Sequence, residues 1–171
     1  MDSQSAALTA NAASFVVLGL LAFWYVVPWL RAQGRERAIT ALLWVHAFRY
    51  VALELFSAER AGLAVPPHLR DQIAYGDLLG AVLAVVCILA LRRASPAAIP
   101  LTWLFVVATF LDLSNALVGG VRYRMMGEVH DLPWLILCFY VPALWITLGL
   151  IVWLLLSGRR PARTPTGRAG A

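Results

Sequence analysis

The stretch "AITALLWVHAFRYVALELFS", residues 38–57, decides the fold class of this chain. It is mostly apolar, and as an α-helix it would extend about 30 Å, the thickness of the hydrocarbon core of a bilayer. Yet it carries His46, Arg49 and Glu54. Ionisable groups inside a membrane helix normally face the interior of a helix bundle, so the stretch predicts a membrane helix with a polar inner face.

Segments of the same length and character recur along the 171 residues, of which 61% are hydrophobic. Soluble domains are closer to half apolar. Backbone polar groups must all be paired in lipid, so each segment is expected to be a helix. The sequence therefore predicts an all-α, multipass membrane bundle of five transmembrane helices in one domain, 1–157. The expected spans are 12–30, 38–57, 72–91, 99–118 and 133–156.

The distribution of arginine predicts the orientation of the bundle. Nine arginines fall on one side of the predicted spans, in 31–37, 92–98 and 158–171, and four fall on the other side, in 58–71 and 119–132. The richer side is expected to be cytoplasmic. The prediction is N-terminus out and C-terminus in, within the cell (inner or plasma) membrane. The last fourteen residues are expected to form a disordered, basic cytoplasmic tail.

This orientation places nearly all intramembrane polar side chains in the outer half of the bundle. A charge near the centre of a membrane helix costs about 2.5–3.5 kcal/mol to insert, so Arg49 needs acidic partners. Glu54 lies about 140° around the same helix and pairs poorly with it. Asp77 and Asp112 lie at similar depth on other spans and are the expected partners. The predicted ligand-binding residues are His46, Arg49, Glu54, Tyr75, Asp77, Asp112 and Asn115.

The charges in this layer do not balance, because Arg49 faces the three carboxyl groups of Glu54, Asp77 and Asp112. In a low dielectric, either some of these carboxyls carry protons or a cation lies among them. The leading hypothesis is a net-acidic pocket in the outer half of the bundle. It would bind or transport a small cationic or amphiphilic ligand, or protons.

Two other functions remain open from the sequence. The polar layer would serve an accessory subunit equally well, by docking a larger membrane protein. The same carboxyls would also suit a membrane enzyme that acts on a lipid or isoprenoid by acid/base chemistry. The sequence contains no Walker A, GxGxxG, HExxH, GxSxG or CxxC motif. It therefore favours binding over catalysis, and no catalytic residue is assigned.

No metal, cofactor or nucleic-acid partner is predicted. The segment "GEVHDLP", 127–133, offers Glu128, His130 and Asp131, but one short cluster is a nonspecific signal for a metal. We interpret it as a solvated loop in which Asp131 caps the fifth helix. His46 has no second histidine at its depth to complete a haem site. The arginines are spread over short loops, so the expected partner is the lipid bilayer.

Two local patterns concern packing around the polar layer. In "GDLLG", Gly76 and Gly80 share one helix face, which predicts a close approach by another helix. Pro142 lies inside the fifth span and is expected to kink it and to free backbone carbonyls.

Overall fold

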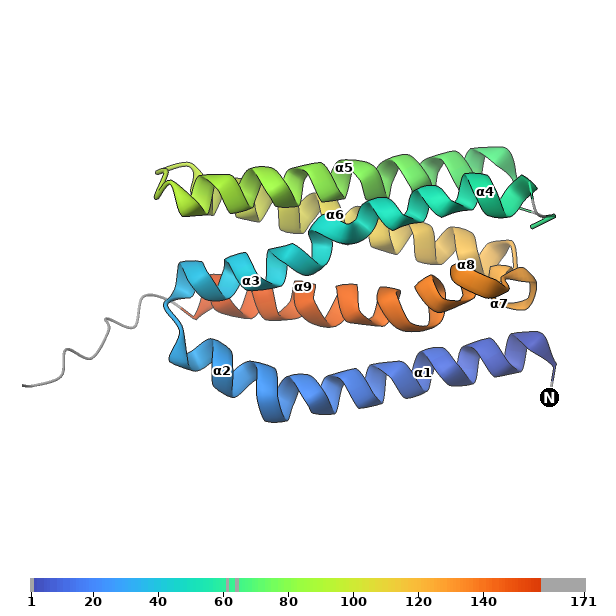
Figure 1. Cartoon of the computed structure of the whole chain (residues 1–171), viewed down its shortest axis with the longest axis horizontal. Helices are drawn as coiled ribbons and strands as arrows, with labels where there is room; N and C mark the ends of the chain where they lie inside the picture. The colour runs from blue at the N-terminus through green and yellow to red at the C-terminus, as the bar shows by residue number, and fades with distance from the viewer. Residues whose placement is uncertain (1, 61, 64, 158–171) are drawn as a thin grey trace, which may run out of the picture.

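A computed structural model describes residues 2–60, 62–63 and 65–157 of the chain. This part is helical throughout its spans, has no strand, and runs five times along the long axis of the molecule in alternating directions (Figure 1). The first two crossings are α1 (Ser3–Leu21), η1 (Ala22–Val26) and α2 (Val27–Ala32), then α3 (Arg35–Ala47), η2 (Phe48–Glu54) and α4 (Leu55–Arg60). The others are α5 (Pro67–Arg92), α6 (Ala98–Arg122) and, after α7 (Met125–Glu128), α8 (Asp131–Leu135), η3 (Ile136–Tyr140) and α9 (Val141–Leu156).

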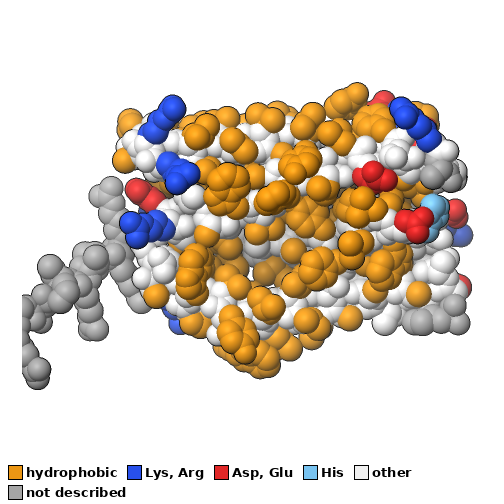
Figure 2. All heavy atoms as spheres, viewed as in Figure 1, with side chains coloured by type: hydrophobic (Ala, Val, Ile, Leu, Met, Phe, Trp, Pro, Cys, Tyr) orange, Lys and Arg blue, Asp and Glu red, His pale blue; other side chains and the backbone are white. Residues whose placement is uncertain are grey.

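Five continuous helices, 3–32, 35–60, 67–92, 98–122 and 131–156, are long and apolar enough to span a membrane. The predicted all-α architecture, with five helices of the length and apolarity of membrane spans, is therefore confirmed, and each predicted span lies inside the corresponding helix. Hydrophobic side chains cover the middle of the visible face, while most charged side chains gather near the two ends (Figure 2). The predicted tail, 158–171, lies outside the described residues.

The first helix begins nine residues before its predicted start, because Asp2 caps it. The Asp2 carboxylate accepts a hydrogen bond of 3.0 Å from the backbone N–H of Ser5. Side-chain oxygens of this kind satisfy donors that a helix start leaves unpaired. The Ser5 contact also lowers the pKa of the Asp2 carboxyl.

The helices pack in an order that leaves α1 at the edge of the bundle. α3 packs on α5 and α9, α5 packs on α6, and α1 lies along α7, η3 and α9 (Figure 1). A large apolar core fills the end of the bundle near residues 31–37, around Ile39, Phe105 and Ile151. A smaller apolar cluster lies at the opposite end, around Leu69 and Met125.

Two spans contain a π-helical turn just before a proline. The turn η1 precedes Pro28, and η3 precedes Pro142. Proline lacks an N–H donor and its ring clashes with the carbonyl four residues earlier, so a widened turn accommodates it. The prediction that Pro142 frees carbonyls is confirmed at Leu137, whose carbonyl oxygen accepts a 2.9 Å hydrogen bond from Asn11 Nδ2 of α1.

The second span tightens into a 3₁₀ helix over η2, where the sequence predicted a regular α-helix. A 3₁₀ helix has three residues per turn, so side chains three apart align along one face. Apart from Ala47, the buried residues from the end of α3 to α4 follow that spacing: His46, Arg49, Ala52, Leu55 and Ala58. The tightened turn thereby directs Arg49 into the bundle, toward α5 and α6.

Candidate functional site

Arg49 is fully buried and connects three helices through its guanidinium group. Its Nε donates to Asp77 Oδ1 of α5 at 2.6 Å, and its Nη2 donates to Asp112 Oδ2 of α6. A third donor, Nη1, lies 3.3 Å from the Thr109 hydroxyl of α6. The predicted pairing of Arg49 with Asp77 and Asp112 is confirmed. We call Arg49, Thr109, Asp77 and Asp112 the arginine network.

Two glycines of α5 make room for this network. A Cβ atom on Gly80 would come within 2.9 Å of Arg49 Cζ, and one on Gly76 within 3.0 Å of Asp112 Cγ. Real Cβ atoms do not approach that closely, so any larger residue would displace the charged side chains. The prediction of a close approach at "GDLLG" is thus confirmed, with side chains from η2 and α6 occupying the glycine face.

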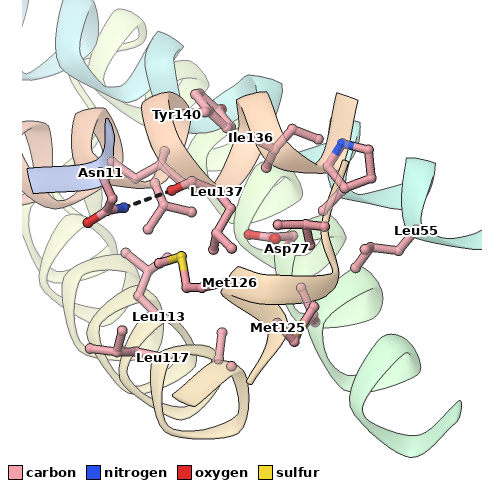
Figure 3. Close-up of a pocket in the computed structure, with 18 of the residues that line it drawn as sticks. Asn11, Leu55, Asp77, Leu113, Leu117, Met125, Met126, Ile136, Leu137 and Tyr140 are labelled. Atoms are coloured by element: carbon pink, nitrogen blue, oxygen red, sulfur yellow. Dashed lines mark hydrogen bonds between the residues drawn. The ribbon is translucent and has the colours of Figure 1, made fainter. Parts of the chain in front are cut away.

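A cavity of about 240 Å³ lies next to the network, in the half of the bundle that the sequence predicts to be outer. Its walls are mostly aliphatic, and Arg49 and Asp77 are the charged residues among them. Figure 3 shows Asp77 among Met126, Leu137 and Ile136. The pocket is less polar than the sequence predicted, because side chains such as Leu113, Leu117 and Val129 form most of its lining.

The cavity reaches the surface between α1 and α6. Leu8 of α1 and Leu117 and Val121 of α6 line the cavity and are also exposed on the apolar surface. α1 packs on α7, η3 and α9 and hardly touches α6.

Two polar groups from the walls are not among the predicted ligand-binding residues. Asn11 lines the cavity and holds α1 to η3 through its bond to the Leu137 carbonyl. Tyr140 also lines it, and its hydroxyl donates to the Val45 carbonyl of α3 at 2.6 Å. A side-chain amide within an apolar helix could have marked Asn11 as a candidate. The predicted span began at residue 12, however, and so left Asn11 out.

The other predicted residues lie apart from the cavity. His46 is fully buried in the large apolar core, where its Nε2 lies 3.1 Å from the Thr147 hydroxyl and its ring meets Phe105 edge-on. Tyr75 is 59% exposed, and its ring lies tilted against the ring of Phe56. Asn115 is exposed on α6 and Glu54 is half-buried, and neither lines the cavity.

The loop before the fifth span differs from its prediction in one detail. Asp131 is the first residue of α8, and His130 occupies the capping position without a side-chain cap, so the prediction that Asp131 caps the helix is wrong. The Asp131 carboxylate instead accepts from the neighbouring His130 ring at 2.9 Å. Across the residues that the structure describes, no group of three side chains is arranged to hold a metal ion.

Five helices long and apolar enough to span a membrane, a buried arginine network and a mostly aliphatic cavity beside it define the class: an all-helical bundle of the multipass membrane type. The chain matches a family model described as a domain of unknown function (DUF8737) over residues 6–156, and it belongs to that family. Comparisons with curated proteins and with solved structures found no match.

Proposed function

We propose that this protein binds a small amphiphilic molecule in the cavity beside the arginine network. The observation that carries the proposal is the composition of the cavity: aliphatic walls with a single charged end formed by Arg49 and Asp77. An engineered apolar cavity of about 150 Å³ is enough to hold a benzene-sized ligand. The present one, of about 240 Å³, suits a short apolar chain or ring.

The charged end favours a ligand head that donates hydrogen bonds or carries positive charge. Asp77 and Asp112 together outnumber Arg49 by one formal charge. Asp77 uses Oδ1 for Arg49, its side chain is 15% exposed, and its Oδ2 accepts no hydrogen bond from the described residues. That oxygen would accept from an ammonium or hydroxyl group at the base of the cavity. The ligand would enter from the bilayer between α1 and α6.

Two probes with the same chain and opposite heads test the proposal: dodecylamine and dodecanoate. Native mass spectrometry of the detergent-purified protein would measure how much of each stays bound. We expect wild type to retain dodecylamine over dodecanoate, and Asp77→Asn to lose that preference. Ala116→Phe, which fills the cavity, should lose both probes.

The matched control is Val118→Phe, on the same helix and at similar depth. Val118 is 65% exposed and lies outside the cavity lining, so this variant should bind as wild type does. Equal binding of dodecylamine by Ala116→Phe and Val118→Phe would refute the cavity as the binding site. Preference for dodecanoate in wild type would refute the proposed head group.

A second candidate is an accessory subunit, and Asn115 favours it. This side chain is exposed on α6 between Leu111 and Val118, which are exposed apolar residues, and it has no hydrogen-bond partner among the described residues. An unpaired amide facing lipid is unfavourable, and a partner helix would satisfy it. We expect a stoichiometric partner to co-purify in mild detergent with wild type but not with Asn115→Leu. A monodisperse free protein would argue against this role.

We further propose that the N-terminus faces out and residues 31–37 face the cytoplasm of an inner or plasma membrane. Nine of the arginines that flank the spans fall in 31–37, 92–98 and 158–171, and four fall in 58–71 and 119–132. Alkaline phosphatase, which is active only outside the cytoplasm, should be active when fused after Gly62 and inactive when fused after Ser95. The reverse pattern would overturn the orientation.

A further inference from the structure

A second hollow, a cleft of about 460 Å³, lies at the end of the bundle that holds residues 31–37. The turn between α2 and α3 forms one side of it and the end of α9 forms the other. Its lining includes Leu30, Arg31, Gln33, Arg35, Trp153 and Leu154. The cleft therefore combines two guanidinium groups with apolar and aromatic side chains at the level where a span leaves the membrane. We call it the arginine cleft.

Neither arginine of the cleft is neutralised by an acidic side chain. Arg31 has its Cζ 5.7 Å from the centre of the Trp153 ring, and the described residues provide no ion pair to Arg31 or to Arg35. Glu36 is the nearest acid along the chain, but it is exposed and does not line the cleft. The segment 158–171 contains no Asp or Glu.

Arg35 also has a buried donor that remains unused. Its Nη2 donates to the Leu155 carbonyl at 2.7 Å, which fixes the guanidinium against the end of α9. Its Nε is buried and has no hydrogen-bond partner among the residues that the structure describes. Buried N–H groups are nearly always paired, so a fixed guanidinium with a spare buried donor indicates an acceptor other than those that the described residues provide.

We propose that the arginine cleft binds the phosphate group of an anionic phospholipid. Guanidinium groups match phosphate oxygens in geometry and charge, and they bind them through paired hydrogen bonds. Trp153 has the apolar body and N–H donor of a residue that lies at a membrane interface. Leu30 and Leu154 line the same cleft and would contact the first carbons of the acyl chains. Basic pockets between membrane helices bind phospholipid head groups in this way.

Native mass spectrometry with defined lipids tests this site. Wild type, Arg31→Gln and Arg35→Gln would each be mixed with phosphatidylglycerol or with phosphatidylcholine of the same chains. We expect wild type to retain phosphatidylglycerol preferentially, and each variant to lose about fivefold in affinity for it. Arg31 makes no hydrogen bond to the described residues, so Arg31→Gln keeps the test valid if Arg35→Gln fails to fold.

The matched control is Arg37→Gln, which removes an exposed charge from the same end of α3 but leaves the cleft intact. Retention of phosphatidylglycerol in Arg37→Gln with loss in Arg31→Gln supports the site. Equal loss in the two variants, or equal retention of both lipids by wild type, overturns it in favour of general surface charge. Displacement of the lipid by millimolar inorganic phosphate would keep a phosphate site but overturn its assignment to a lipid head group.

Discussion

The two halves of the bundle are built from the same kinds of residue but packed in opposite ways. The interior of the half near residues 31–37 is filled by the large apolar core, in which Ile39, Phe105 and Ile151 are wholly buried, and the arginine cleft is confined to its outer end. The other half contains the cavity and only a small apolar cluster. The arginine network lies at the boundary between them. Charged groups here border the cavity, while His46 lies within the solid half.

This difference separates two uses of buried side chains. In the solid half, buried side chains mainly pack against one another. Even the polar Thr102 donates its hydroxyl hydrogen bond within its own helix, to the Ala98 carbonyl. In the hollow half, helices are held apart and joined by polar contacts, such as the bond from Asn11 to Leu137. Substitutions should therefore act differently on the two sides of Arg49.

The largest effect is expected from Arg49→Met, which removes the charge at the boundary. Asp77 and Asp112 would lose their shared partner, and breaking a buried pair in this way costs about 3–5 kcal/mol. Reversible unfolding in mixed detergent micelles would measure the loss. Adding Asp77→Asn and Asp112→Asn to the same chain should restore most of the stability. A change below about 1 kcal/mol in the single variant would show that the network does not hold the helices together.

Enlarging an alanine in each half compares the solid and hollow packing directly. Ala84 is wholly buried in the large apolar core, so Ala84→Leu should overpack it and cost about 1–3 kcal/mol. Ala116 lines the cavity, and Ala116→Leu should change stability by less than about 0.5 kcal/mol, since the added atoms enter empty space. The two unfolding midpoints provide the measurement. Equal losses would mean that the cavity is not open in solution.

Gly80→Ala tests the contact between α5 and the boundary. The new methyl group would meet Arg49, which three hydrogen bonds hold in place, so we expect a loss of about 1 kcal/mol. Gly149→Ala is the matched control, because nothing lies within 4 Å of a Cβ at that helical position. The control should be neutral or slightly stabilising. Equal thermal stability of the two variants would contradict the close approach.

The smallest effect is expected from Asn11→Ala, which removes a contact of the hollow half. Hydrogen bonds between membrane helices contribute about 0.6 kcal/mol on average, so the loss should be of that size. Thr9→Ala serves as a control, since the Thr9 hydroxyl bonds only the Ser5 carbonyl of its own helix. Trypsin or thermolysin digestion of the detergent-solubilised protein would report whether α1 detaches more readily. Identical digestion rates for the two variants would show that Asn11 does not hold α1.

The sequence was sufficient for the five spans and for the pairing of Arg49 with Asp77 and Asp112. The first follows from the length of the apolar segments and the second from the depth of the charged residues along them. Both quantities can be read from a single sequence. The sequence did not specify equally well which side of each helix faces the interior of the bundle. Tyr75 is only two residues from Asp77, yet that spacing places it on nearly the opposite side of α5, where it is exposed.

The 3₁₀ turn and the cavity lay beyond the reach of the sequence. No proline or glycine marks η2, and the three-residue spacing of its buried side chains is visible only with the neighbouring helices in place. The cavity is lined by residues from most of the helices, so it depends on how whole helices pack against one another. Its mainly aliphatic lining could not be distinguished from ordinary core residues in the sequence.

The position of α1 has a consequence for the order of assembly. Its packing partners, α7, η3 and α9, are all encoded more than 100 residues later, and the Asn11–Leu137 bond spans 126 positions. During synthesis the first helix therefore enters the membrane long before any surface exists on which it can dock, while the arginine network needs only residues up to Asp112. We expect chains expressed as two pieces, 1–33 and 34–171, to associate in the membrane and co-purify. Failure of the second piece to fold without the first would show instead that the first helix acts as a template for the others.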